Sequence, residues 1–204
     1  MFEDHTKIAE NFWTSKNDYP SYGNIKQRRL HELNFLVPKL QGESILDLGC
    51  GDGALINCLY HTTNFKNYFA FDWSKNLLKG VNHNIQTKFY DCNNAQDLPK
   101  VDTIIFAGVL PFIFEDGKVL ELFDKFNANN IFIRTPCNLG TSREIVNTFS
   151  DNLQEQYSSV YRTIDEVKNL INKKFKLIET VRIYPDEIES KFGTKQYYFV
   201  AKKL

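Results

Sequence analysis

The chain has 204 residues, of which 42% are hydrophobic, a length and composition that suit one compact domain with a sizeable core. Its 25 basic and 25 acidic side chains cancel to a formal net charge of zero, which excludes a long-range field that gathers nucleic acid or an anionic membrane. No apolar run approaches the roughly 20 residues that span a bilayer, and the N-terminus does not resemble a signal peptide. We therefore expect a cytoplasmic protein with neither a nucleic-acid nor a membrane partner.

The four cysteines are scattered along the chain and form neither a Cys-x-x-Cys pair nor a Cys/His cluster at zinc-ligand spacing. They are interpreted as reduced thiols, and no metal site is expected. The cysteines are Cys50, Cys58, Cys92 and Cys137.

Residues 1–42 form the less regular part of the sequence. NIKQRRLHELNFLVPKL predicts a helix that ends before Pro38, because a residue that precedes proline disfavours the helical conformation. The preceding stretch, WTSKNDYPSYGN, is rich in turn residues. We expect a single domain in which residues 1–42 form a helical cap or lid and residues 43–204 form a Rossmann-like core.

Short apolar strands alternate with stretches of helical length after residue 42. Strands are predicted at residues 44–48, 68–71, 88–90, 103–106, 130–134, 176–184 and 196–202, with helices such as 53–60 and 117–126 between the first five. This βαβα order predicts an α/β fold with a doubly wound, mostly parallel seven-stranded sheet and helices on both faces. The last two strands are joined by a short polar loop, so we expect them to pair antiparallel at the sheet edge.

One further helix is predicted by its own start signal. In TIDEVKNLINKKF, Thr163 is followed three residues later by Glu166, which is a capping box. Apolar residues then recur on one helical face, and the helix leads directly into the sixth strand. The apolar positions are Ile164, Val167, Leu170 and Ile171.

The stretch SILDLGCGDGAL, residues 44–55, places three alternating glycines between a predicted strand and a predicted helix. Glycine permits positive φ and lets a ligand approach the backbone closely, and a helix N-terminus offers unpaired N–H groups. The turn formed by Gly49, Gly51 and Gly53 is therefore interpreted as a ligand-binding turn, with an ordinary strand-to-helix turn as the alternative.

Two cofactor classes use a turn of this kind. Gly49, Gly51 and Ala54 satisfy the dinucleotide pattern G-x-G-x-x-G/A, but such a strand usually opens its domain, and here some forty residues precede it. The stretch LDLGCGDG resembles the first motif of class I S-adenosylmethionine (SAM)-dependent methyltransferases, of the small bacterial type that acts on small molecules. The resemblance extends from about residue 42 to the C-terminus. It implies SAM as the cofactor and S-adenosylhomocysteine as the product.

The resemblance implies a role for individual residues. Asp47 and the turn at residues 49–53 would lie against the amino acid portion of SAM. Asp72, at the end of YFAFD, would accept hydrogen bonds from both ribose hydroxyls, and Trp73 would stack on adenine. Asp91, in FYDCNN, would accept from the adenine amino group. The implied cofactor-binding residues are Asp47, Gly49, Cys50, Gly51, Gly53, Asp72, Trp73, Asp91, Cys92, Gly108 and Val109.

Three of these residues leave alternatives open. Asp91 also suits a turn cap, and Trp73 also suits a core position. Asp72 supports a nucleoside site in either cofactor class without deciding between them.

Methyl transfer from a sulfonium needs alignment of the acceptor more than a strong base, so we expect catalysis by positioning. The segment after the fourth strand reads AGVLPFIF and lacks the Asn/Asp-Pro-Pro-Tyr/Phe motif of methyltransferases that act on bases or glutamine, which favours an oxygen acceptor. The catalytic residue is left open, with Tyr22 and Tyr161 as candidates. Trp13, Tyr19 and Tyr22 are expected to form a lid. The four histidines are expected at the surface: His5, His31, His61 and His83.

Three arginines indicate the acceptor. Arg134 ends a parallel strand at the edge where open α/β sheets bind ligands, and Arg143 and Arg162 follow in segments that the family commonly uses to cover the substrate. Because guanidinium binds phosphate in a forked geometry, they predict a small polar, anionic acceptor. A phosphorylated or nucleotide-linked sugar fits, such as a capsule or surface-polysaccharide precursor, including phosphoramidate decorations. The alternative places Arg143 and Arg162 as solvated helix residues.

Other functions stay open. A protein or RNA methyltransferase is disfavoured by the neutral charge and by the lack of a basic or aromatic platform. A SAM-binding partner or regulator without catalysis is compatible with the missing acid and base residues. A nicotinamide-dependent dehydrogenase is the alternative for the cofactor. We expect a monomer or a homodimer.

Overall fold

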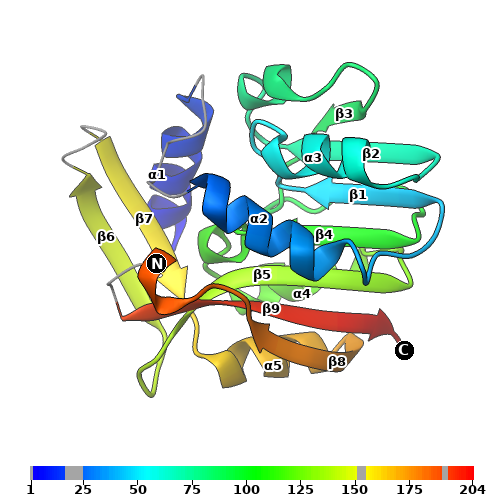
Figure 1. The fold of residues 1–204 in the computed structure, drawn as a ribbon. Coiled ribbons are helices and arrows are strands. Elements are labelled where there is room, and N and C mark those ends of the chain that lie inside the picture. Colours follow the sequence, from blue (N-terminus) through cyan, green and yellow to red (C-terminus); the bar gives the residue numbers. More distant parts are fainter. Residues whose placement is uncertain (1, 17–24, 151–154, 190–192) are drawn as a thin grey trace.

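The structure is a computed structural model that describes residues 2–16, 25–150, 155–189 and 193–204. Its main sheet has the strand order β3-β2-β1-β4-β5-β9-β8 (Figure 1). The strands from β3 to β5 in this order are parallel, and β9 runs antiparallel to both of its neighbours, β5 and β8. The predicted fold class is therefore confirmed. The strands are β1 (Ser44–Leu48), β2 (Asn67–Asp72), β3 (Gln86–Phe89), β4 (Thr103–Ala107), β5 (Asn130–Asn138), β8 (Phe175–Arg182) and β9 (Thr194–Lys203).

The β1 strand has the bounds predicted from the sequence. Ile45, Leu46 and Leu48 are fully buried, as expected for a strand of a parallel sheet that is covered on both faces. Ile45 packs with the core on one face, and Leu46 packs with the core on the other. This central position fixes the direction in which the chain leaves the strand and enters the glycine turn.

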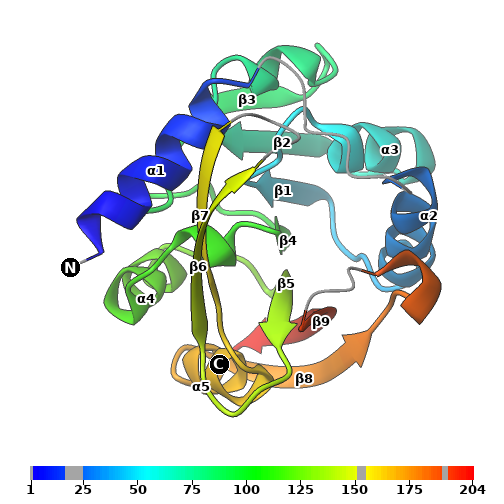
Figure 2. The same ribbon diagram turned by 90° about the vertical axis from the view of Figure 1, so that its left-hand side faces the viewer.

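Helices cover both faces of the sheet, as Figures 1 and 2 show. One face carries α2 (Ile25–Leu36) and α3 (Ala54–Thr62), and the other carries α4 (Asp116–Asp124) and α5 (Ile164–Asn172). The predicted capping box at the start of α5 is confirmed by its backbone and side-chain hydrogen bonds. In the described part of the chain, no helix has the length and apolar character needed to cross a bilayer. Short 3-10 helices are η1 (Leu77–Gly80), η2 (Leu110–Phe112) and η3 (Asp186–Ile188).

A cap of a helix and a hairpin stands at the carboxyl ends of the parallel strands. Figure 2 looks onto this edge and shows α1 (Glu3–Thr14) with the hairpin of β6 (Glu144–Ser150) and β7 (Glu155–Tyr161) in front of the sheet. The rings of Phe12 and Tyr157 meet edge to face at 5.1 Å and join the two parts of the cap. The sequence did not predict the hairpin. The N-terminal residues belong to two parts of the fold, because α1 is part of the cap and α2 packs against the sheet face.

The fifth strand is longer than predicted. The sequence placed its end at Arg134, where its pairing with β4 does end, opposite Ala107. The structure continues β5 to Asn138 because β9 remains paired with it up to Thr194. Pro136 is accommodated in this extension, where the ladder with β4 is already over.

Candidate functional site

The glycine turn after β1 needs glycine for conformation and for space. Gly49, Gly51 and Gly53 have φ values of +77°, +58° and +78°, in the left-handed region that side chains disfavour. A Cβ atom on Gly49 would lie 2.0 Å from Cγ2 of Val109. The bare backbone therefore lets β1 and the segment after β4 approach each other at the sheet edge. The N–H groups of Gly49, Cys50 and Gly51 are held by acceptors at the end of β2.

A pocket of about 530 Å³, open solvent at its mouth included, lies against this turn. It is formed by the carboxyl ends of the parallel strands and by the cap, where parallel α/β sheets bind ligands. Its lining residues are Trp13, Gly49, Gly51, Asp72, Trp73, Leu77, Tyr90, Cys92, Asn93, Ala107, Gly108, Val109, Phe112 and Ile113.

Asp72 ends β2 and is 6% exposed. Its Oδ2 accepts the backbone N–H of Gly51 at 2.9 Å, and its Oδ1 accepts the backbone N–H of Ser74 at 2.8 Å. Burial raises the pKa of Asp72, and these N–H groups partly offset the rise. A carboxylate offers about four acceptor positions, so two bonds to the backbone leave capacity for hydroxyl groups of a ligand.

The pocket lining includes groups that suit a flat heterocycle. Trp73 and Leu77 supply apolar surface, and Cys92 and Asn93 supply polar atoms. Asn93 Oδ1 is buried and has no hydrogen-bond partner in the described structure, whereas its Nδ2 donates to the carbonyl of Phe112 at 3.4 Å. A buried acceptor without a partner is costly, which makes Asn93 Oδ1 a candidate acceptor for a ligand donor.

Asp91 acts as a turn cap, which was the alternative that the sequence left open for it. Its Oδ1 accepts the backbone N–H of Asn93 at 2.8 Å, which makes it a turn cap. Asp91 is half-buried and does not line the pocket, whereas Asn93, two residues further along the same motif, does.

Asp47 lies behind the glycine turn, 2% exposed, and does not line the pocket. Burial raises its pKa to about 7, while Arg29 and Arg134 act to lower that pKa and Glu32 acts to raise it. Glu32 on α2 pairs with both arginines, at 2.6 Å to Arg29 and 2.7 Å to Arg134. The carboxyl group of Asp47 therefore belongs to a buried charged network that joins α2 to the sheet.

Arg134 lies beneath the pocket floor. Its Nε is 2.7 Å from Glu32 Oε1, and its Nη1 donates to Gln196 Oε1 at 2.9 Å. Its Nη2 would be 3.1 Å from a Cβ atom on Gly108, a glycine that lines the pocket with φ +82°. The guanidinium thus supports the floor and is paired with a buried carboxylate that it shares with Arg29.

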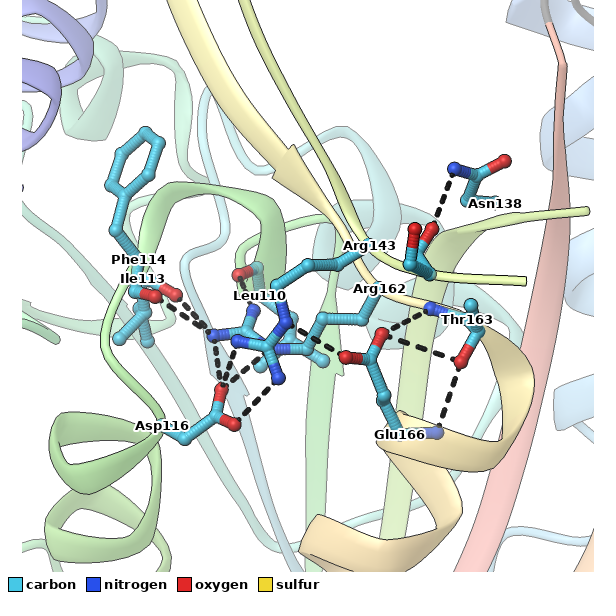
Figure 3. Close-up of polar contacts among 10 residues, drawn as sticks. Leu110, Ile113, Phe114, Asp116, Asn138, Arg143, Arg162, Thr163 and Glu166 are labelled. Atoms are coloured by element: carbon cyan, nitrogen blue, oxygen red, sulfur yellow. Dashed lines mark hydrogen bonds and ion pairs between the residues drawn. The ribbon is translucent and has the colours of Figure 1, made fainter. Parts of the chain in front are cut away.

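Arg143 and Arg162 are held in the ion-pair network drawn in Figure 3. Asp116 accepts from both guanidinium groups, and Glu166 accepts from Arg143 Nε at 2.8 Å. Neither arginine is a solvated helix residue, because Arg162 is 2% exposed at the end of the hairpin and Arg143 precedes β6. Two carboxylates balance the two guanidinium groups, so this cluster offers no excess positive charge to an anionic acceptor.

The structure brings part of the predicted site together. Of the implied cofactor residues, those that line the pocket are Gly49, Gly51, Asp72, Trp73, Cys92, Gly108 and Val109, and those that do not are Asp47, Cys50, Gly53 and Asp91. Tyr19 and Tyr22 lie outside the described residues, and Tyr161 is half-buried at the end of β7 without lining the pocket. Trp13 lines the pocket from α1, as a lid residue would.

The histidine prediction holds only in part. His61 and His83 are exposed, but His5 and His31 are half-buried. His5 is drawn into the cap because its Nδ1 hydrogen-bonds with Ser158 Oγ at 2.9 Å and its ring stacks on Phe114. None of the four histidines lines the pocket.

Sequence reasoning missed several lining residues. Asn93 could have been found from its place in the FYDCNN motif, and Phe112 and Ile113 from their place after the fourth strand. The full set is Leu77, Tyr90, Asn93, Ala107, Phe112 and Ile113. Over the described residues, no group of three or more His, Cys, Asp or Glu side chains is placed to hold a metal ion.

Comparison with known sequences agrees with this geometry. Residues 39–193 match a family model described as a methyltransferase domain. A curated relative, malonyl-[acyl-carrier protein] O-methyltransferase of Marinomonas sp. (strain MWYL1), is 28% identical over 99 residues. That match covers 47% of this chain and 37% of the relative, so the chain spans little more than a third of the relative's length.

Solved structures share the fold over most of the chain. Phosphoethanolamine N-methyltransferase 1 of Haemonchus contortus, in complex with phosphoethanolamine and S-adenosylhomocysteine, has a TM-score of 0.74 at 14% identity, over 100% of this chain and 50% of that chain. A SAM-dependent methyltransferase from Clostridium acetobutylicum ATCC 824 has a TM-score of 0.60 at 15% identity, over 88% of this chain and 92% of that chain. At these identities the likeness is one of fold.

Proposed function

The chain belongs to the methyltransferase domain family, and we propose that it is a SAM-dependent enzyme that methylates an oxygen atom of a small polar molecule. The observation that carries the cofactor site is the contact between Gly51 and Asp72, which places an acidic acceptor beside a bare backbone turn. SAM, when bound, supplies an activated methyl group on a sulfonium.

The residues of the pocket fit the parts of SAM. Asp72 has acceptor capacity left for the ribose hydroxyls, and Trp73 offers a flat apolar face for adenine. Asn93 Oδ1, a buried acceptor without a partner in the described structure, suits the adenine amino group. Gly49 and Gly51 line the pocket without side chains, which suits the methionine portion.

The lining residues support catalysis by positioning. Burial raises the pKa of Tyr90 to about 12 and raises the pKa of the Cys92 thiol well above its ordinary value, so both stay protonated at neutral pH. Asp72 already accepts two backbone N–H groups. Trp13 and Phe112, whose rings meet edge to face at 5.3 Å, form an apolar wall that excludes water. The chain's contribution is then alignment of acceptor and methyl group in a dry pocket.

The charge of the acceptor is the finer part of the proposal. A phosphorylated or nucleotide-linked sugar, such as a capsule or surface-polysaccharide precursor, was favoured on three arginines. All three are paired with carboxylates, and only Arg134 lies against the pocket floor. We therefore place neutral and anionic acceptors on an equal footing, and Arg134 remains the argument for an anion.

The proposal is tested with methyl-labelled SAM and matched acceptor pairs: free sugars against their phosphates and nucleotide-linked forms, with Asp72→Ala as the control enzyme. The expected result is label attached through an oxygen atom of a small-molecule product. No label is expected with Asp72→Ala. Label confined to RNA or protein would overturn the small-molecule acceptor. SAM binding with no transfer to any acceptor class would favour a non-catalytic binding module.

A further inference from the structure

Arg162 is the most deeply buried cation of the cap. It follows β7 directly and precedes the N-cap of α5, and 1% of its side chain is exposed. Figure 3 shows the guanidinium pointing toward the segment that links β4 to α4. Burying an arginine is unfavourable unless each of its donors finds an acceptor, so these contacts explain why it is tolerated here.

The acceptors of Arg162 are mostly backbone carbonyls of one segment. Nη1 donates to the carbonyl of Leu110 at 3.2 Å, and Nη2 donates to those of Ile113 at 2.8 Å and Phe114 at 3.4 Å. This segment forms only the single turn of η2, in which the carbonyl of Leu110 accepts the N–H of Ile113, and the carbonyls of Ile113 and Phe114 lie beyond that turn and lack the partners of a longer helix. The guanidinium takes the place of those partners for Ile113 and Phe114.

The same segment forms a wall of the cofactor pocket. Phe112 and Ile113 line the pocket, together with Val109 just before them. Phe112 also contacts Trp13 and accepts, through its carbonyl, the amide of Asn93. A shift of this segment would therefore also move the side chains of Trp13 and Asn93, which line the pocket.

The network around Arg162 fixes its position. Asp116 Oδ1 accepts from Arg162 Nε at 2.9 Å and also from Arg143, which forms a two-pronged pair with the same carboxylate. Arg143 in turn reaches Glu166, whose other oxygen accepts the backbone N–H of Thr163 at 2.9 Å in the capping box of α5. Burial acts to raise the pKa of Asp116, but the two arginines outweigh it and leave that pKa below its ordinary value.

We propose that Arg162 is a positioning residue for methyl transfer, because it fixes the Leu110–Phe114 wall of the cofactor pocket to the hairpin and to α5. The inference rests on the proposed function, since it assigns the wall a role only if the pocket holds SAM. Arginine is required because its five donors in a planar fork reach one carboxylate and three carbonyls together, whereas lysine is a point donor.

The test is calorimetric titration with S-adenosylhomocysteine, which needs no acceptor, at a temperature where circular dichroism shows each variant folded. Arg162→Lys is compared with Arg182→Lys, which changes an ion-paired arginine on β8 away from the pocket. We expect Arg162→Lys to weaken binding at least about tenfold, because small displacements of a positioning wall are costly. Arg182→Lys should stay within about twofold.

A second measurement uses the unmodified protein and does not depend on how a variant folds. Amide hydrogen exchange with and without S-adenosylhomocysteine should show slower exchange in residues 109–116 and also in 157–163, on the far side of the arginine. Protection confined to the glycine turn and the end of β2 would overturn the inference, as would wild-type affinity in Arg162→Lys. If the unmodified protein does not bind S-adenosylhomocysteine, the proposed function fails first and this inference fails with it.

Discussion

The backbone N–H of Gly51 donates to the Asp72 carboxylate at 2.9 Å and so joins the turn after β1 to the residue that ends β2. The two segments are 21 residues apart in the chain and lie on neighbouring strands, whose register pairs Leu48 with Phe71. The contact holds the two recognition elements of the pocket in one rigid unit.

Asp72→Asn and Asp72→Ala should both weaken SAM binding. The amide has one acceptor oxygen where the carboxylate has two, and a hydrogen bond to a charged group contributes about 1.5–3 kcal/mol, which corresponds to a loss of about 10- to 100-fold in affinity. Calorimetry with SAM measures the effect. Asp52→Asn is the control, because Asp52 caps its own turn by accepting the N–H of Ala54 and does not line the pocket. Equal losses in the two positions would contradict a specific role for Asp72.

Variants of Asn93 and Asp91 distinguish the two candidate acceptors for the adenine amino group. If Asn93 Oδ1 is the acceptor, Asn93→Leu should weaken binding of S-adenosylhomocysteine by roughly tenfold, since one neutral hydrogen bond contributes about 0.5–1.5 kcal/mol and the space is also filled. Asp91→Ala should lower thermal stability through the lost turn cap and change affinity less. A larger affinity loss in Asp91→Ala would restore the role implied by family resemblance.

Gly49→Ala should destabilise the fold. The added Cβ would lie 2.0 Å from Val109 Cγ2 in a backbone with φ +77°, and we expect a loss of at least about 2 kcal/mol in the free energy of unfolding. Gly117→Ala is the matched control, because nothing lies within 4 Å of its added Cβ and it is within α4. That variant should gain up to about 1 kcal/mol. Urea denaturation compares the two, and similar curves would contradict the packing argument.

The raised pKa of Asp47 predicts that the stability of the folded chain depends on pH. Its pKa is about 7 in the folded chain against an ordinary 3.8, so between these values the folded state holds a proton that the unfolded state has released. The free energy of unfolding should therefore fall as pH rises through this range, by up to about 1.4 kcal/mol per pH unit, and level off above it. Asp47→Asn removes the titration. Denaturation at several pH values should show the free energy of unfolding of the variant rising relative to that of the wild type as pH increases. A difference that stays constant with pH would contradict the assignment.

The sheet was predictable because its signals are local. The bounds of β1, the glycine turn that follows it and the capping box of Thr163 and Glu166 are each set by neighbours within a few residues. The antiparallel ending also followed from a short loop that leaves no room for a crossover helix. These features depend on sequence periodicity and turn chemistry rather than on distant contacts.

The hairpin of the cap and the pairing of the arginines were not predictable for the opposite reason. The β6–β7 hairpin pairs outside the main sheet, and its position depends on contacts with α1, more than a hundred residues earlier, such as that of Phe12 with Tyr157. Arg162 looks like a substrate residue in the sequence, because its partner Asp116 is 46 residues away. Only the fold shows that the guanidinium is already neutralised.

The most direct test of the central claim is a fluorescence titration with S-adenosylhomocysteine, because the two tryptophans of the chain, Trp13 and Trp73, both line the pocket. We predict a saturable change in tryptophan emission that Asp72→Ala removes, and no saturable change specific to NADH, which is corrected for its own absorbance. A response to NADH that Asp72→Ala removes, with none to S-adenosylhomocysteine, would contradict the account and assign the turn to a dinucleotide.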